Sequence, residues 1–154
     1  MTEERNDPPV RLLVQYQSLC AHDAPDLLVC VPGRDIWAAV RFNGAAFVKL
    51  IDADAGRQVR FTIRSAVRRE TLLHRPLPRW ALYAAGVTAL IDLPALPGAE
   101  ILVCSDEPGG PRGDHALGML MAAYWHAVND LPLEETPLFH LAERARRDYV
   151  ESAG

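Results

Sequence analysis

Lysine, cysteine and long apolar runs are all scarce in this chain. Lys49 is the only lysine among 16 basic residues, an arginine bias that is typical of a GC-rich, often bacterial, genome. The three cysteines, Cys20, Cys30 and Cys104, are an odd number in apolar surroundings, which indicates reduced residues of a cytoplasmic protein. No apolar run approaches the ~18 residues of a membrane-spanning helix, and the polar start MTEERNDPP is unlike a signal peptide. We therefore expect no membrane association.

Basic charge is also in deficit. The 16 basic residues face 20 acidic ones, and the net charge of −4 argues against a general nucleic-acid-binding protein, which needs a basic footprint. The 154 residues are 49% apolar and 23% charged, as in an ordinary globular domain. A chain of ~150 residues buries ~70% of its unfolded surface without a disulfide or metal. We predict a flexible leader over residues 1–9 and a single domain over residues 10–154.

The first half of the chain has the patterns of β-strands. Apolar residues alternate or form short runs, and they predict strands over residues 10–19, 27–31, 36–42, 47–51 and 59–63. Asn43-Gly44 lies between two of these strands, and this dipeptide predicts that 36–42 and 47–51 pair as a hairpin. A further turn is expected from Asp54 to Gly56.

The second half has the period of helices, interrupted by one strand over residues 100–104. Pro78 can open a first helix, and the apolar stripes of three helices are Trp80, Tyr83, Ala84, Val87 and Ile91, then Leu117, Leu120, Met121, Tyr124 and Val128, then Leu138, Leu141, Ala145 and Tyr149. On the last helix, about 137–150, Glu143 precedes Arg147 by four residues, the order that favours an ion pair. Strands first and helices later indicate a two-layer α+β domain, with a mostly antiparallel sheet and helices on one face.

The turn between the strand at 100–104 and the next helix is the most informative stretch. Glycines before a helix N-terminus let an anion approach the exposed backbone N–H groups. This turn carries Asp114 and His115, however, where a phosphate loop has small hydroxyl residues. Asp114 could cap the helix, line a remodelled nucleotide loop or contribute to a metal site. A Walker-type loop is excluded because the turn lacks the lysine and the spacing.

The order of these segments resembles the N-terminal domain of the GHMP kinases, and within them the galactokinase-like sugar kinases. The similarity extends from about residue 10 to residue 154. The turn at 105–116 falls on the phosphate loop of the family, 80–87 on its Trp-containing helix, and 13–22 on its sugar loop. The runs 28–31 and 36–41 resemble its strand pair, and 141–150 resembles the helix before its catalytic segment.

The resemblance implies where a site would lie. The nucleotide-loop candidates are Gly109, Gly110, Arg112, Gly113, Asp114 and His115, and the sugar-contact candidates are His22 and Asp23. The serine places of the family fall on Asp114, His115 and Ala116, while its catalytic aspartate and second domain would lie beyond residue 154. An Asp114 carboxylate would compete with a triphosphate for the same donors, because two unit charges 4 Å apart repel by ~4 kcal/mol at an effective dielectric of 20. No catalytic residue follows from these matches.

A metal site is not expected, because the spacing of Cys20, His22, Asp23 and Cys30 fits no common zinc pattern. Two functions follow from the resemblance. The first is a degenerate galactokinase-like domain that is non-catalytic, needs no cofactor and acts as a binding or interaction module. The alternative is the N-terminal half of a split sugar or small-metabolite kinase, with Mg-ATP as its cofactor. An apolar face left by the second domain predicts a homodimer or a separate protein chain that covers it. A small-molecule ligand is a further expected partner.

Overall fold

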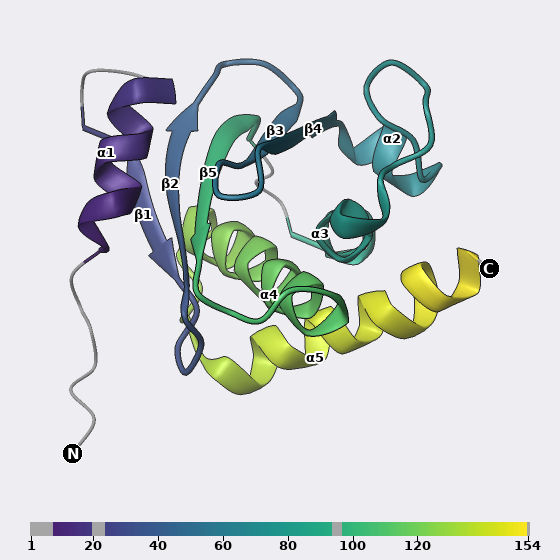
Figure 1. Cartoon of the computed structure of the whole chain (residues 1–154). Helices are drawn as coiled ribbons and strands as arrows, with labels where there is room; N and C mark the ends of the chain where they lie inside the picture. Colours follow the sequence, from purple (N-terminus) through teal and green to yellow (C-terminus); the bar gives the residue numbers. More distant parts are fainter. Residues whose placement is uncertain (1–7, 20–23, 94–96, 154) are drawn as a thin grey trace.

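A five-stranded sheet forms the centre of the molecule. The computed structural model describes residues 8–19, 24–93 and 97–153, and Figure 1 shows the arrangement of their elements. The strands are β1 (Leu27–Cys30), β2 (Ile36–Phe42), β3 (Val48–Asp52), β4 (Arg57–Phe61) and β5 (Ala99–Ser105). The helices are α1 (Val10–Leu19), α2 (Ile63–Val67), α3 (Leu82–Leu90), α4 (Pro111–Val128) and α5 (Glu135–Ala145). A 3-10 turn (Arg79–Ala81) precedes α3, and a π turn (Arg146–Val150) continues α5.

The strand order is β1-β2-β5-β3-β4, and every neighbouring pair is antiparallel except β3 and β5. The predicted hairpin between 36–42 and 47–51 is therefore wrong, because β5 lies between β2 and β3. The backbone after β2 binds the start of β5 instead, with Asn43 N–H donating to the Gly98 carbonyl at 3.3 Å. A Cβ on Gly98 would overlap with the Ala45 carbonyl oxygen, so only glycine lets β5 enter here. The predicted turn after β3 does join β3 to β4 as a hairpin.

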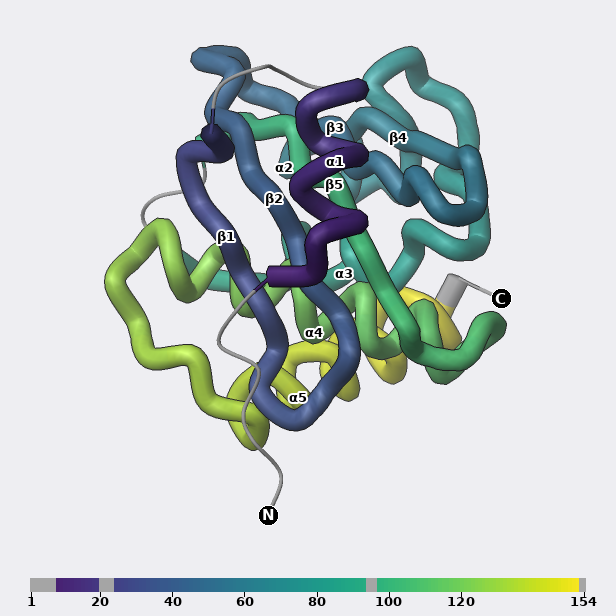
Figure 2. The backbone as a smooth tube through the Cα atoms, turned by 60° about the vertical axis from the view of Figure 1, so that its left-hand side comes forward, coloured from purple at the N-terminus to yellow at the C-terminus, as the bar shows by residue number. Residues whose placement is uncertain are grey.

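The strand predicted over residues 10–19 is instead the helix α1. Leu12 and Tyr16 are four residues apart, so they share one helix face and are both buried, while Val14 between them is 57% exposed. An alternation of apolar residues over so short a segment fits both the two-residue period of a strand and the 3.6-residue period of a helix, and this segment is helical. Figure 2 shows α1 crossing the face of β2 and β5 that lies away from the other helices. Leu12 and Tyr16 pack there against Ala39, Ile51 and Leu102.

The main core lies on the other face of the sheet, under α3, α4 and α5. Trp125, Tyr124 and Phe61 are among its largest buried side chains. The fold class is α+β, as predicted, and the predicted inward residues Leu138, Ala145 and Tyr149 are buried. None of the described helices is long and apolar enough to cross a membrane.

The strand predicted over 59–63 ends at Phe61 because Thr62 caps the short helix α2. The Thr62 hydroxyl accepts a hydrogen bond from the Ser65 N–H at 2.9 Å, and the Ser65 hydroxyl accepts one from the Thr62 N–H at 2.9 Å. This reciprocal capping box fixes a helix start that the alternation of apolar residues concealed.

Candidate functional site

The turn from β5 to α4 ends at Gly110. Gly110 is the N-cap of α4, with φ +79°, and Pro111 occupies the first helical position. The Asp114 N–H already donates to the Gly110 carbonyl at 3.0 Å. Asp114 therefore lies within the first turn of α4, and the prediction that it caps the helix is wrong. A carboxylate in this turn still interacts favourably with the helix dipole.

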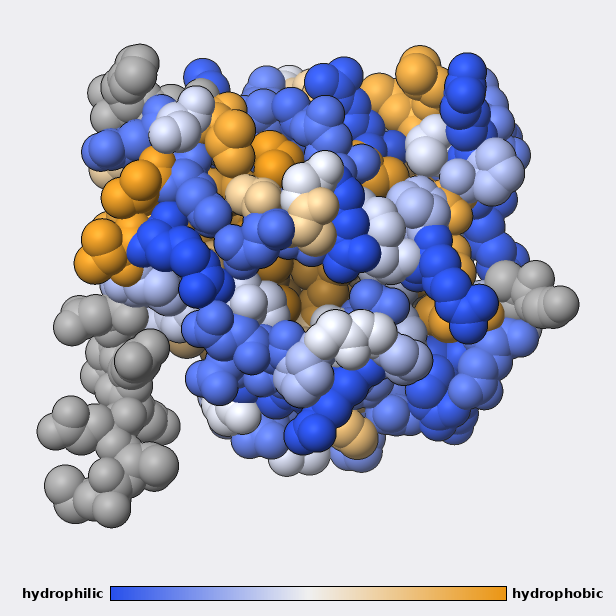
Figure 3. Space-filling view, in the orientation of Figure 1, coloured by the Kyte–Doolittle hydropathy of each residue, from blue (hydrophilic) through white to orange (hydrophobic). Residues whose placement is uncertain are grey.

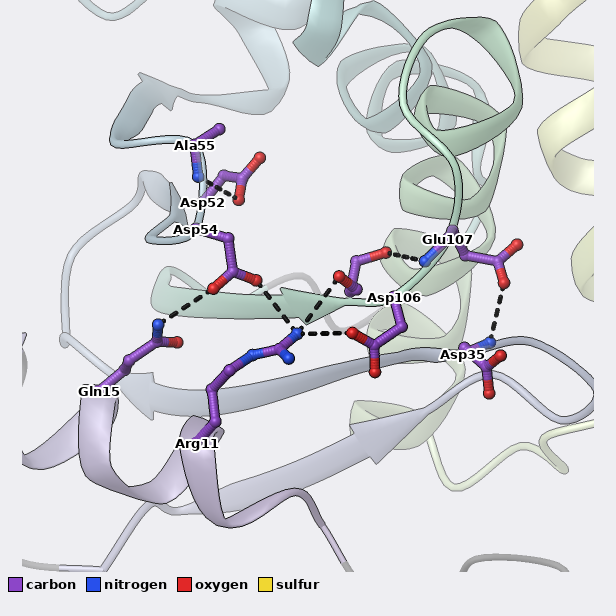
Figure 4. A network of polar contacts seen from close by, with 9 residues as sticks. Arg11, Gln15, Asp35, Asp52, Asp54, Ala55, Asp106 and Glu107 are labelled. Carbon is purple, nitrogen blue, oxygen red and sulfur yellow. Dashed lines mark hydrogen bonds and ion pairs between the residues drawn. The ribbon is translucent and has the colours of Figure 1, made fainter.

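The turn folds back on α4 and is tied to the loop between β1 and β2. A Cβ on Gly113 would overlap with the Pro108 carbonyl oxygen, so this glycine is required by the chain itself. Glu107 binds Arg34 at 2.6 Å. Its carboxylate also accepts a hydrogen bond from the Asp35 N–H at 3.1 Å, as Figure 4 shows. The Glu107 N–H in turn donates to the Ser105 hydroxyl at 3.1 Å. These contacts hold the turn in one place above the ends of the strands.

A pocket of about 260 Å³ opens between this turn and the turn from β3 to β4; we call it the acidic pocket. Its floor is apolar, with Ile36, Val103 and Leu117. Its charged lining residues are Asp52, Asp54, Glu107, Asp114 and Arg57. Four carboxylates and a single guanidinium thus line the pocket.

Most of these carboxylates have partners. Asp52 binds Arg57 at 2.9 Å. Asp54 binds two residues of α1, Arg11 at 3.3 Å and Gln15 at 3.1 Å (Figure 4). Asp114 is the exception, because its side chain makes no hydrogen bond or ion pair within the described residues. Burial raises the pKa of Asp114, although Arg57 and Arg79 act in the opposite direction.

A second pocket, of about 370 Å³, lies on the other flank of the first turn of α4. We call it the arginine pocket; it is lined by Arg34, Tyr83, Pro111, Arg112, His115, Phe139, Glu143 and Arg146. His115 is buried, with one ring nitrogen, Nε2, 3.1 Å from Glu143 Oε1. Its ring lies 5.5 Å from that of Tyr83 and 5.2 Å from that of Phe139.

Burial and pairing act on the pKa values of His115 and Glu143 in different ways. Burial lowers the pKa of His115, although Glu143 opposes the shift. The Arg146 guanidinium, 2.7 Å from Glu143, lowers the pKa of that carboxyl. Arg146 also binds Glu151. The predicted pair between Glu143 and Arg147 is thus replaced by contacts of Glu143 with Arg146 and His115.

The structure divides the predicted nucleotide-loop residues between the two pockets. Gly109, Gly110, Gly113 and Asp114 line the acidic pocket, while Arg112 and His115 line the arginine pocket. The sugar-contact candidates His22 and Asp23 lie outside the described residues. No three His, Cys, Asp or Glu side chains in residues 8–19, 24–93 and 97–153 are grouped to hold a metal ion.

Sequence reasoning missed the residues that other elements bring to these pockets. Asp52, Asp54 and Arg57 reach the acidic pocket because β3 lies beside β5, with Asp52 opposite Val103. The predicted hairpin of 36–42 with 47–51 would have placed this turn elsewhere. Arg34, from the loop between β1 and β2, carried no local signal for the second pocket.

Comparison with known proteins identifies the fold but no sequence relative. No protein-family model matches the chain, and no curated protein matches its sequence. Among solved structures, the mevalonate kinase of Methanococcus jannaschii matches 73% of this chain with a TM-score of 0.52 and 8% identity. The galactokinase of Lactococcus lactis, in complex with galactose, matches 77% with a TM-score of 0.54 and 17% identity.

These matches cover 37% of the mevalonate kinase and 31% of the galactokinase, so the chain spans about a third of their length. The expected resemblance to the GHMP kinases, which was based on collinear segments, is confirmed for the fold. The chain has the α+β fold of a GHMP kinase N-terminal-like domain.

Proposed function

We propose that this chain is a non-catalytic GHMP-kinase-like module, which binds a small molecule or a protein partner and does not transfer phosphate from ATP. The observation that carries the proposal is the acidic pocket. It lies at the start of α4, where the resemblance would put the nucleotide phosphates, and four carboxylates line it.

Electrostatics disfavours a triphosphate in this pocket. Each phosphate charge within about 4 Å of an unpaired carboxylate such as Asp114 is repelled by ~4 kcal/mol at an effective dielectric of 20. Arg57 is the only cation of the lining, and it is already bound to Asp52 at 2.9 Å. Arg57 therefore offsets only part of the repulsion.

Two backbone positions at the start of α4 offer no donor to a phosphate group. Pro111 has no N–H at the first helical position, and the Asp114 N–H is bonded to Gly110. Gly113 faces the Pro108 carbonyl oxygen, which is itself an acceptor. These features support a turn that has the backbone shape of an anion-binding loop but binds a phosphate group less well.

An exposed apolar surface supports a protein partner, either a second copy or another chain. Val10 is 75% exposed and Val14 57% exposed, both on α1, and Leu28 on the edge strand β1 is 39% exposed. Figure 3 shows apolar side chains at the surface over α1. Among the described residues of α5, Phe139 is the large apolar side chain that is strongly exposed. Sedimentation analysis of the wild type and of Val14→Asp tests whether the α1 surface mediates self-association.

The nucleotide question is tested by thermal unfolding with and without Mg-ATP. A ligand at 100 times its dissociation constant adds ~2.7 kcal/mol of stability, so binding would give a clear upward shift. We expect no shift for the wild type. Asp114→Ser, which restores the hydroxyl type of the family loop, should be the more responsive variant, and Asp35→Ser is the control. A shift in the wild type overturns the proposal and favours the split kinase.

A further inference from the structure

We propose that the arginine pocket binds a small aromatic anion, in which a flat ring lies against Phe139 and a negatively charged group faces Arg112. The site is separate from the acidic pocket, on the opposite flank of α4. The inference rests on the proposed role as a binding module, and it does not depend on whether nucleotide binds at the acidic pocket.

The arginines of the pocket favour an anionic ligand. Two arginines of the pocket are already matched by carboxylates, Arg34 by Glu107 at 2.6 Å and Arg146 by Glu143 at 2.7 Å. The exposed guanidinium of Arg112 makes no hydrogen bond or ion pair within the described residues. Arg146 also binds Glu151, so Arg112 is the one guanidinium of the pocket lining without a bound carboxylate within the described residues, and it lies beside two guanidiniums that their ion pairs hold in place. A planar guanidinium binds a carboxylate or phosphate through parallel hydrogen bonds.

The apolar walls select a ring. Phe139 is 42% exposed, although its ring lies 5.2 Å from that of His115, which is buried. Tyr83 closes the same side, 5.5 Å from His115. An aromatic ligand would cover the exposed part of Phe139 in the offset or edge-to-face geometries that aromatic pairs prefer. The volume of about 370 Å³ suits a single ring with one charged substituent.

His115 provides a second way to detect binding, through the pH dependence of the affinity. Its Nε2 is engaged with Glu143, and its Nδ1 makes no hydrogen bond within the described residues. The charged or titratable groups around the ring are Arg34 from the β1–β2 loop, Tyr83 from α3, and Glu143 and Arg146 from α5. Burial lowers the pKa of the ring, and a bound anion would favour its protonated form. Binding should therefore take up a proton and become tighter as the pH falls.

The experiment is a calorimetric and NMR titration of the full chain with benzoate and with phenyl phosphate, which share the ring and differ in the anionic group. Benzyl alcohol is the neutral control ligand. We expect at least one anion to bind, to shift the His115 ring signals, and to bind more tightly at pH 6 than at pH 8. Benzyl alcohol should bind about tenfold more weakly than that anion.

Two variants localise the site. Arg112→Gln removes an exposed side chain with no partner, so the fold should be unaffected while anion affinity falls about tenfold. Arg147→Gln, an exposed arginine of the same chain outside the pocket, is the matched control and should bind like the wild type. The proposal is overturned if neither anion binds, if Arg112→Gln binds as tightly as the wild type, or if benzyl alcohol binds equally well. Stabilisation by Mg-ATP would contradict only the function proposed for the acidic pocket.

Discussion

Asp114 and His115 are adjacent in sequence, yet they face pockets of opposite charge on the two flanks of α4. The Asp114 carboxylate lies among other carboxylates and has no bonded partner within the described residues. The Glu143 carboxylate, in the arginine pocket, contacts both Arg146 and His115. Burial raises the pKa of Asp114, whereas Arg146 lowers that of Glu143. The sign of each shift is thus set by whether desolvation or pairing dominates.

Under the two proposals, the start of one helix does not bind an anion on one flank and binds one on the other. The positive end of a helix dipole acts on both flanks of the first turn. In the acidic pocket its effect is opposed by carboxylates, and in the arginine pocket it is supported by Arg112. The side chains around a helix N-terminus therefore decide the ligand chemistry more than the backbone does.

The largest expected effect on stability comes from a substitution at Gly113, where the 105–110 turn packs against α4. Gly113→Ala places a methyl group against the Pro108 carbonyl oxygen, so the 105–110 turn must move away from α4. We expect a loss of about 2–3 kcal/mol in the free energy of unfolding, because the strain exceeds the helix-propensity gain of about 1 kcal/mol. Chemical denaturation measures the change.

Gly109→Ala is the matched control for this variant. Gly109 lies in the same turn, but a Cβ there meets no atom within 4 Å. Its effect should stay within about 0.5 kcal/mol, as for other surface substitutions. Equal stabilities of the two variants would contradict the account of the turn.

A smaller loss of stability is expected when a contact within the arginine pocket is removed. Glu143→Ala removes the oxygen that binds His115, and leaves a buried ring nitrogen without its partner. The cost should be about 1–2 kcal/mol. Glu143→Gln keeps an oxygen at this place and should recover part of the loss. Unfolding curves in denaturant compare the three proteins, and identical midpoints would refute the contact.

The fold class, the strands β1 to β5 and the helices α3 to α5 could be predicted from the sequence because their apolar patterns are local. Two errors share a physical cause: a short apolar alternation fits a helix as well as a strand. Leu12 and Tyr16 turned out to be four residues apart on α1, and Thr62 ended the strand before Ile63.

The site was only half predictable. The turn at 105–114 and the acidic residue Asp114 at its end were visible in the residues themselves. The division of Asp114 from His115 was not, because it depends on where the first turn of α4 begins. The contribution of Asp52, Asp54 and Arg57 required the parallel pairing of β3 with β5, a long-range contact without a sequence signature.

Lowering the pH tests the directions of the pKa shifts of His115 and Glu143. Burial lowers the pKa of His115, so the fold loses stability as the pH falls below the ordinary histidine value of about 6.5. Glu143 also has a lowered pKa, and its contribution is lost only at lower pH, below about 4.3. His115→Gln should flatten the decline between about pH 7 and pH 5. Thermal unfolding across this range tests it, and an unchanged slope in the variant would exclude His115 as the cause.

The smallest effect, and the one of opposite sign, is expected at Asp114. Because its pKa is raised, the ionised carboxylate weakens the fold at neutral pH, and this penalty is relieved as the pH falls through its pKa. Asp114→Asn should therefore stabilise the protein, by no more than about 0.5 kcal/mol, since the group is only half-buried and solvent screens it. Asp54→Asn should instead lower stability, because Asp54 is bound to Arg11 and Gln15. If the denaturation midpoints of both variants moved in the same direction, the difference in pairing between Asp114 and Asp54 would not explain their effects on stability.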